Sequence, residues 1–323
     1  MRVAATSEKA RQVMVLLTQI QKQFVQQLIT MSTQAGKPNA FEKVEWLRDK
    51  GEHGGGLRYQ LAVTGLFSRA SVNVSQVHFE YSDDKKFTVA TALSTIVHPA
   101  HPCLPSLHLH ISWTLLKNGQ SYWRIMADLN PAIVDLSDKQ TFDNALRVAA
   151  AEYYAQGCAL GEQYFNIPAL AVHRGVSHFY LEGFNPDCAE FLAFPSNFAE
   201  TMINAYTEII SDKSKRVKAK TKEQVNTQLA YHTLYFYQVL TLDRGTTAGL
   251  LAHDQNDLGT LGSLPAYISR DLLSRWIAKT VAPKDKLITA LLAIFPNTNR
   301  CAVTEKEKRQ IAKIIRDFYK IHR

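Results

Sequence analysis

The sequence lacks the patterns that would place it in several common classes of protein. Its 323 residues contain no G-x-G-x-x-G or Walker loop, so a nucleotide-dependent enzyme has little support. No apolar run approaches the roughly 20 residues that a membrane span requires, so we expect no membrane insertion. No internal repeat or flexible low-complexity linker stands out, which favours one mixed fold over an array of small units.

Cysteine is scarce and scattered along the chain. The four cysteines, Cys103, Cys158, Cys188 and Cys301, include no Cys-x-x-Cys pair, which argues against a zinc knuckle or a disulfide scaffold. The N-terminal stretch MRVAATSEKARQVMV has no uninterrupted apolar region ahead of a small-residue cleavage site. We therefore expect an unexported protein of the reducing cytoplasm.

Negative charge is also in deficit. Aspartate and glutamate number 29 against 37 lysines and arginines, which gives a formal net charge of +8. Such a balance favours an anionic partner, which could be nucleic acid, a membrane surface or a polycarboxylate. Much of the excess lies in residues 213–222 and 306–323, which we interpret as solvated loop and helix surface. No nucleic-acid motif accompanies these runs, so we expect no nucleic-acid partner. A nucleic-acid-binding or membrane-surface function would rest on the charge alone.

The periodicity of the chain alternates between helix and strand without a regular βαβ pattern. A helix is predicted from about Ser7 to Met31, where apolar residues recur at three-to-four spacing and Ser7 can act as N-cap. Strand-like alternation follows from Phe41, and helical spacing returns over residues 141–165 and 195–211. This mixture favours one α+β domain over a dinucleotide-binding fold.

The C-terminal third contains both kinds of signal. Gln224 to Tyr237 is interpreted as a helix, or as a helix that becomes a strand. The run YFYQVLTLDRGTTAGLL is expected to form a strand with Asp243-Arg244-Gly245-Thr246 at its turning point. A last helix is predicted to begin at a capping box formed by Thr304 and Glu307.

The stretch from Ala90 to Ser112 carries most of the reactive side chains. Its three prolines confine residues 99–105 to a crossing between two strands, over about 90–97 and 106–115. Because strand side chains alternate, paired strands would present a polar, titratable stripe suited to proton transfer or metal binding. A solvated sheet face is the equally weighted alternative. The stripe would contain Ser94 and His98 from the first strand and His108, His110 and Ser112 from the second.

Several segments, taken in order, make the chain resemble the oxygen-dependent coproporphyrinogen III oxidases of haem biosynthesis. The segments span about residues 10 to 295, so we expect residues 1–295 to form the family's domain and 296–323 an additional basic C-terminal helix. They are Gly54 to Gly56, FxxAxVNxSxVH from Phe67 to His78, VHPxxPxxPSxH from Val97 to His108, Asp128-Leu129-x-Pro131, Tyr164-Phe165, Arg174-Gly175, LDRGTTAGL from Leu242 to Leu250 and Ser263-Leu264-Pro265.

The resemblance implies both a fold and a reaction. The fold is a large, rather flat antiparallel β-sheet covered by helices on both sides, usually in a homodimer. The reaction is the oxidative decarboxylation of two propionates of an anionic tetrapyrrole to vinyl groups. Dioxygen is the acceptor and no organic cofactor is used, so the chain needs acid–base groups and basic clamps.

The resemblance also implies roles for individual residues. His108 matches the family's proton-donating histidine, and Asp128 matches an aspartate that holds pyrrole nitrogens. Asp243 and Arg244 match the Asp-Arg pair of the DRGT motif, and we expect Arg244 to meet His108 and Asp128 around one hollow. Structural roles are the alternatives, with Asp128 as a turn cap and DRGT as a salt-bridged turn. The expected substrate-binding residues are Ser94, His110, Ser112 and Gly245.

The chain departs from the family pattern where carboxylates would be gripped. The H-x-N-x-R strand ends in Ser112 instead of arginine, and the glycine triplet before Asp128 begins with Arg124. Arg124 and Arg58 are therefore candidates to compensate. The losses also keep open a non-catalytic relative that binds or carries tetrapyrrole or haem.

The metal ligands of the resemblance are incomplete as well. His98 and His108 are at most two ligands, because two further histidine positions correspond to about Asn144 and Ala169. A dedicated site needs three or four ligands, so we expect no bound metal unless His110 or His173 substitutes.

Overall fold

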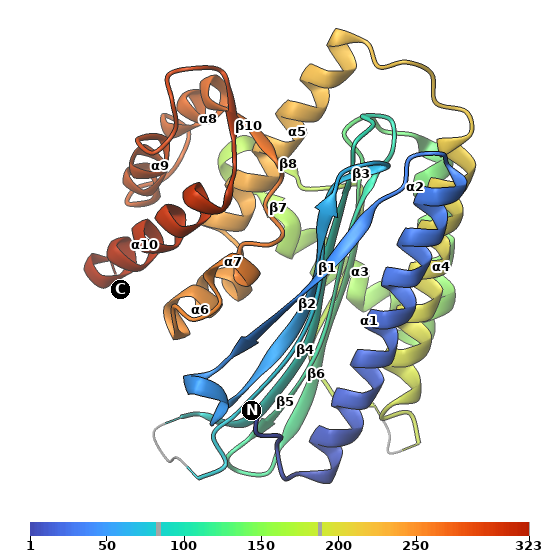
Figure 1. The fold of residues 1–323 in the computed structure, drawn as a ribbon, viewed down its shortest axis with the longest axis vertical. Helices are drawn as coiled ribbons and strands as arrows, with labels where there is room; N and C mark the ends of the chain where they lie inside the picture. The colour runs from blue at the N-terminus through green and yellow to red at the C-terminus, as the bar shows by residue number, and fades with distance from the viewer. Residues whose placement is uncertain (82–84, 187–188, 323) are drawn as a thin grey trace.

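A seven-stranded antiparallel sheet runs through the middle of the molecule (Figure 1). The computed structural model describes residues 1–81, 85–186 and 189–322. The strand order is β1-β2-β3-β4-β5-β6-β9, so the first six strands are neighbours both in sequence and in space. The strands are β1 (Ala40–Leu47), β2 (Gly54–Val63), β3 (Phe67–His78), β4 (Phe87–Pro99), β5 (Ser106–Leu116), β6 (Ser121–Asn130) and β9 (Ser177–Phe184).

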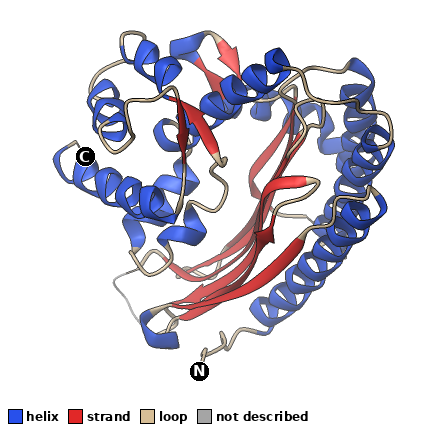
Figure 2. Cartoon of the chain, turned by 45° about the horizontal axis from the view of Figure 1, so that its top comes forward, coloured by secondary structure: helices blue, strands red, loops and turns tan. Residues whose placement is uncertain are grey.

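Helices cover both faces of this sheet, as Figure 2 shows. One face is covered by α1 (Glu8–Gln34), α2 (Leu136–Ala150) and α4 (Ala193–Ser214), while α3 (Tyr154–Phe165) packs on the edge strand β9. The predicted α+β class is confirmed. The opposite side holds α5 (Lys222–Thr241), α6 (Arg244–Ala252), α7 (Asp257–Thr260), α8 (Arg270–Ile277), α9 (Lys284–Leu292), α10 (Glu305–Ile321) and the short pair β10 (Tyr267–Ser269) and β11 (Arg300–Ala302). The remaining short elements are β7 (Asn166–Ile167), β8 (Val172–His173) and the 3-10 turns Asp49–Gly51, Ala151–Tyr153 and Pro168–Leu170.

The two faces of the sheet differ in chemistry because side chains alternate along each strand. In β5, Leu107, Leu109, Ile111 and Trp113 are fully buried in the core formed with α1, α2 and α4. The residues between them therefore face α5 to α7. The predicted alternation of β4 and β5 is confirmed, since Ser94 pairs with His110 and Ile96 with His108.

The helix predicted near the N-terminus is also confirmed. The helix α1 begins at Glu8, and the Ser7 hydroxyl accepts a hydrogen bond from the backbone N–H of Ala10. The capping box of α10 is present, formed by Thr304 and Glu307.

The prediction of a strand that begins at Tyr235 is wrong. Residues Lys222–Thr241 form one helix, and Asp243 is the N-cap of the next helix, α6. The aromatic run imitates a strand because Tyr235, Phe236 and Tyr237 are all buried, and a helix buried on most sides loses its amphipathic signature.

The C-terminal helix α10 shares a core with the helices before it. Ile311, Ala312 and Ile315 are fully buried in the cluster that also contains residues of α5, α6, α8 and α9. Arg316 of α10 forms a bidentate ion pair with Asp257 of α7, with nitrogen–oxygen distances of 2.8 and 2.5 Å. The helix α10 thereby packs against α6 and α7 and holds them in place.

Two further findings concern membrane-spanning helices and cysteines. Within the described ranges, no helix has both the length and the apolar character needed to cross a bilayer. Cys103, Cys158 and Cys301 are free thiols, and Cys188 lies outside the described residues.

Candidate active site

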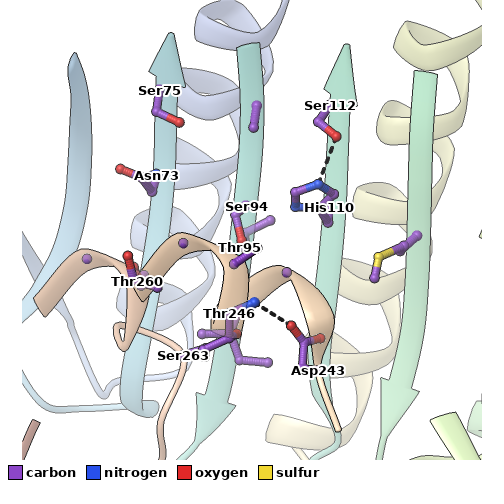
Figure 3. A pocket seen from close by; sticks show the side chains of 18 of the residues that line it. Asn73, Ser75, Ser94, Thr95, His110, Ser112, Asp243, Thr246, Thr260 and Ser263 are labelled. Atoms are coloured by element: carbon purple, nitrogen blue, oxygen red, sulfur yellow. Dashed lines mark hydrogen bonds between the residues drawn. The ribbon is translucent and has the colours of Figure 1, made fainter. Parts of the chain in front are cut away.

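A cleft of about 410 Å³ lies between the polar face of the sheet and the helices α5 to α7. Its floor consists of alternating residues of β3, β4, β5 and β6, and its roof consists of α6, α7 and the segment that follows them. In Figure 3, Ser94, His110 and Ser112 project from neighbouring strands, and α6, which carries Thr246, crosses in front of the same face of the sheet. The polar stripe predicted from the sequence is therefore a cleft floor and not a solvated surface.

His108 belongs to a buried charge relay at one end of this floor. Its Nδ1 lies 2.6 Å from Oδ1 of Asp128, directly across the β5–β6 ladder. Arg174 donates from Nη2 to the other carboxylate oxygen of Asp128 at 2.8 Å. Asp128 and Arg174 are 0% and 1% exposed, whereas His108 is 9% exposed and lines the cleft. Arg174 also lines the cleft, but His108 is the more exposed of the two and is thus the member of this group that presents a proton-transfer group to a ligand.

The protonation states of this group follow from its charges. Although burial disfavours a carboxylate, Arg174 and His108 hold the pKa of Asp128 well below its usual range. Burial also acts against the Arg174 cation, but Asp128 raises the pKa of Arg174. Asp128 is therefore ionised, and its carboxylate accepts the Nδ1–H of His108. This arrangement leaves Nε2 of His108 as the ring nitrogen that can give or take a proton.

Arg174 is held by contacts on several sides. Its Nη1 donates to Oε1 of Gln238 at 2.7 Å, and its guanidinium lies over the rings of Phe165 and Tyr235 at 4.3 and 4.8 Å. Arg174 and Gln238 are functional residues to which the sequence reasoning assigned no role. Arg174-Gly175 did appear among the segments that carry the resemblance, and that was the available signal.

The middle of the cleft floor combines uncharged polar side chains with the guanidinium of Arg124. His110 shares a hydrogen bond of 3.0 Å with the Ser112 hydroxyl. Burial, together with the nearby Arg124 and His108, lowers the pKa of His110 well below its usual value, so its imidazole is uncharged. Ser112 pairs directly with Arg124 in the β5–β6 register, and Arg124 lines the cleft. The arginine missing at position 112 is therefore replaced by one on the neighbouring strand.

Asp243 connects the roof of the cleft with this arginine. Its Oδ1 accepts the backbone N–H of Thr246 at 2.6 Å, which caps α6, and its Oδ2 accepts the Tyr164 hydroxyl at 3.1 Å. Tyr164 in turn accepts a hydrogen bond of 3.1 Å from Nη2 of Arg124. Burial, followed by the Asp243 carboxylate, raises the pKa of Tyr164, so the phenol stays protonated. Gly245 lines the cleft beside this chain of contacts.

Arg244 is the predicted site residue that lies apart from the others. Its guanidinium is 3.5 Å from Glu182, its side chain is 70% exposed, and it lines a different hollow. The first turn of α6 directs Gly245 and Thr246 toward the cleft and Arg244 away from it. The DRGT segment is a helix cap, and Arg244 forms its ion pair with Glu182 instead of Asp243.

His98 has both ring nitrogens occupied. Nδ1 contacts the Ser106 hydroxyl at 2.9 Å, and Nε2 contacts the carbonyl of Ser263 at 3.1 Å. Burial and the nearby His232 lower the pKa of His98 well below its usual value. His98 and His108 therefore do not fit a shared metal site, and the described residues hold no group of three or more metal-ligating side chains. The absence of a resident metal stays a prediction.

Five residues that line the cleft have a buried polar side-chain atom without a partner in the part of the chain that the structure describes: Trp46, Asn73, Thr95, Arg124 and Arg174. Two of these atoms matter most for a ligand with polar groups. They are Oδ1 of Asn73 and Nε of Arg124, and both residues line the cleft. Unpaired buried polar groups are costly, so each is a place where a bound molecule would gain a hydrogen bond.

Comparisons with known proteins agree on one family. The family model described as coproporphyrinogen III oxidase matches residues 12–292. The chain is 25% identical over 248 residues to an oxygen-dependent coproporphyrinogen-III oxidase of Rickettsia typhi, covering 72% of this chain and 86% of the relative. It is 27% identical over 252 residues to the protein of the same name from Rickettsia akari, covering 73% of this chain and 87% of the relative. These matches confirm the resemblance seen in the sequence: the chain belongs to the coproporphyrinogen III oxidase family.

Proposed function

We propose that the cleft carries out the oxygen-dependent oxidation of coproporphyrinogen III in haem biosynthesis, giving protoporphyrinogen IX. Each of two propionate side chains loses CO2, one proton and two electrons and becomes a vinyl group. For each propionate, one dioxygen accepts the two electrons together with that proton and one proton from solvent, which gives hydrogen peroxide. The observation that carries this proposal is the His108–Asp128–Arg174 relay at the cleft floor. It supplies one accessible proton-transfer nitrogen, backed by a carboxylate that stays ionised.

His108 is the catalytic residue in this proposal, and Asp128 and Arg174 position it. The ionised Asp128 fixes the tautomer of His108 with the proton on Nδ1 and stabilises the imidazolium when Nε2 takes up a proton. A proton removed from a pyrrole nitrogen makes the ring electron-rich, which favours its oxidation. Asp128 acts through His108 because its two carboxylate oxygens are already bonded to His108, Arg174 and Asn130.

The substrate carboxylates need cations, and Arg124 is the first candidate. It lines the cleft together with the expected substrate-binding residues Ser94, His110, Ser112 and Gly245. Its Nε is unpaired, and Tyr164 holds its Nη2 in the cleft. Each charged hydrogen bond to a carboxylate contributes about 1.5–3 kcal/mol. Arg124 therefore supports retained substrate binding in spite of the serine at position 112.

Dioxygen is a co-substrate in this reaction, and we propose that no organic cofactor or metal is needed. The closed donor set of His98, whose two ring nitrogens both have partners, supports that view. The assay is turnover of coproporphyrinogen III by the purified protein under air, with and without a chelator. Formation of protoporphyrinogen and CO2 in both samples supports the proposal. No product from this protein, while another family member is active in parallel, rejects it.

A non-catalytic tetrapyrrole or haem carrier is the second candidate. It is favoured by the replacement of the family's asparagine and arginine by His110 and Ser112. Titration with coproporphyrin and haem separates the two functions. Tight binding without turnover of the reduced substrate favours the carrier, whereas turnover favours the oxidase.

We also propose a cytoplasmic homodimer in which residues 296–323 are an addition to the family's domain. The family resemblance supports the dimer, and the three free cysteines support a reducing compartment. The end of the family match at residue 292 supports the addition. Light scattering of the purified protein tests the dimer, and a monomer at micromolar concentration would contradict it.

A further inference from the structure

Three cationic side chains converge where α10 meets the polar face of the sheet. Arg58 extends from β2, Arg69 from β3 and Lys308 from the first turn of α10. Arg58 and Lys308 are only 3% and 5% exposed, and Arg69 is half-buried. None of them belongs to the site described above.

The three cations have carboxylates nearby but no direct anionic contact within the described part of the chain: Glu305 acts electrostatically on all three, and Glu42 acts on Arg58. None of them forms an ion pair with a carboxylate there. Arg58 donates only to the amide oxygens of Gln60 and Asn256, and Arg69 donates to the carbonyl of Val303. Nε of Arg69 is buried without a partner. Lys308, in the residues described, makes no hydrogen bond through Nζ.

Such a cluster is electrostatically unfavourable when nothing is bound to it. Burial and the cations of Arg69 and Arg58 lower the pKa of Lys308 to about 7, against an opposing effect of Glu305. Buried arginines and lysines are normally paired, because an unpaired buried charge destabilises the folded state. An anion between the three side chains would remove most of this destabilisation.

A cavity of about 260 Å³ is present at the cluster. Arg69 and Lys308 line it, together with Glu42 and Glu305, which form no ion pair with the cluster. Ser71 lines both this cavity and the main cleft, so the two are neighbours. Arg58 also borders the cleft wall, because its Nη1 contacts Asn256 of that wall.

We propose that Arg69 and Lys308, which line this cavity, form a binding site for a carboxylate or phosphate group, with the cation of Arg58 next to them. The group has two possible sources: a propionate arm of a tetrapyrrole lying in the cleft, which rests on the proposed function, or a free small anion. Lys308 lies beyond the region matched by the family model, which ends at residue 292. The site is therefore a feature of this chain's C-terminal helix.

The test compares the wild type with Lys308→Met, Arg69→Gln and the matched control Lys306→Met. Lys306 is an exposed lysine in the same turn of α10, so its loss changes the net charge equally. One arm measures the shift in melting temperature on adding sodium phosphate or sodium succinate, against sodium chloride of equal ionic strength. The other arm measures binding of coproporphyrinogen III without dioxygen, so that binding is separated from turnover.

Either of two results supports the site and identifies the source of the group. If a substrate arm binds, Lys308→Met and Arg69→Gln weaken coproporphyrinogen binding by about 10- to 150-fold, as expected for a charged hydrogen bond, and Lys306→Met does not. If a free anion binds, phosphate or succinate raises the melting temperature of the wild type and Lys306→Met only. The proposal is overturned if both cluster variants bind all probes like the wild type. The anion arm needs no tetrapyrrole, so it gives a result even if the oxidase function fails.

Discussion

Arg124 lies directly opposite Ser112 across the ladder between β5 and β6. The family resemblance leads us to expect arginine at position 112 and glycine at position 124, so the cation has changed strands while staying on the same face. Directly opposed side chains on one face of a sheet have Cβ atoms only about 5 Å apart. The cleft therefore keeps a guanidinium that a comparison of single positions would score as lost.

The exchange predicts that Arg124→Ala raises KM for coproporphyrinogen III by about 10- to 150-fold, as expected for the loss of a charged hydrogen bond. The double variant Arg124→Gly with Ser112→Arg should recover most of that loss, because it restores the family's arrangement. Steady-state kinetics of both variants provide the measurement. An Arg124→Ala protein with unchanged KM would show that Arg124 only supports Tyr164.

His108→Ala is expected to reduce kcat by about 100-fold or more, since positioned acid–base groups contribute at least that much. His173→Ala is the matched control, because His173 is 41% exposed and pairs with Glu162 on the surface of the protein. Its variant should keep nearly full activity. Equal and mild losses in both variants would contradict a proton-transfer role for His108.

Asp128→Asn keeps the shape of the side chain but leaves Arg174 buried without a counter-charge. Breaking a buried pair in this way costs about 3–5 kcal/mol of the free energy of unfolding. The exposed pair Asp212–Arg216 offers the control, and Asp212→Asn should cost less than about 1 kcal/mol. Urea denaturation measures both variants.

The same carboxylate predicts how stability depends on acid. The pKa of Asp128 is lower in the folded protein than in the unfolded chain, so its contribution is complete above the ordinary value of 3.8. It is lost progressively as the pH falls below that value, because the unfolded state then binds more protons. Acid unfolding of Asp128→Asn should therefore show a shallower pH dependence than that of the wild type. Parallel curves would mean that Arg174 does not hold Asp128 ionised.

The pKa of Lys308, a basic group, leads us to expect a second effect of pH on stability. Its pKa is about 7 in the folded protein against an ordinary 10.5, so between these values the unfolded chain holds a proton that the folded protein has released. Stability attributable to Lys308 therefore rises with pH across this window. The charged groups that face Lys308 are Arg58, Arg69 and Glu305. The difference in unfolding free energy between Lys308→Met and the wild type should shrink from about pH 7 to about pH 9, and Lys306→Met should show no such trend.

The packing of α10 against α6 and α7 leads us to expect that a core substitution in α10, away from His108, lowers turnover. Ile311→Ala removes a fully buried side chain and should cost about 2–5 kcal/mol. Turnover should also fall, because α10 supports α6 and α7, which form the cleft roof. The exposed neighbour Gln310 supplies the control variant, Gln310→Ala. Full activity of a destabilised Ile311→Ala protein at low temperature would separate α10 from the cleft.

The sheet face was predictable from the sequence because it follows from local alternation. His108, His110 and Ser112 are two residues apart, so any strand through them places all three on one side. The surrounding Leu109 and Ile111 fixed which side would be buried. Local periodicity was sufficient wherever one face of an element is apolar and the other polar.

The residues that sequence reasoning missed depend on contacts between distant segments. Arg174 reaches Asp128 from a loop 46 residues further along the chain, and no local pattern encodes that contact. Arg244 was misplaced because its segment was expected at the turning point of a strand, whereas it forms the first turn of α6, which places Gly245 and Thr246 at the cleft and Arg244 beside Glu182. The family resemblance supplied the residues of the motif but not their orientation.

The alternation in β5 also links correct folding to a competent cleft. A slip of one residue in strand pairing would turn His108 and His110 into the apolar core and expose Leu109 and Ile111 to solvent. That misregistered chain would bury polar imidazoles and lose the contacts with α1 and α4, so it could not persist as a folded species. The strand pairing that buries Leu109 and Ile111 in the core is therefore the same pairing that places His108 and His110 at the floor of the cleft.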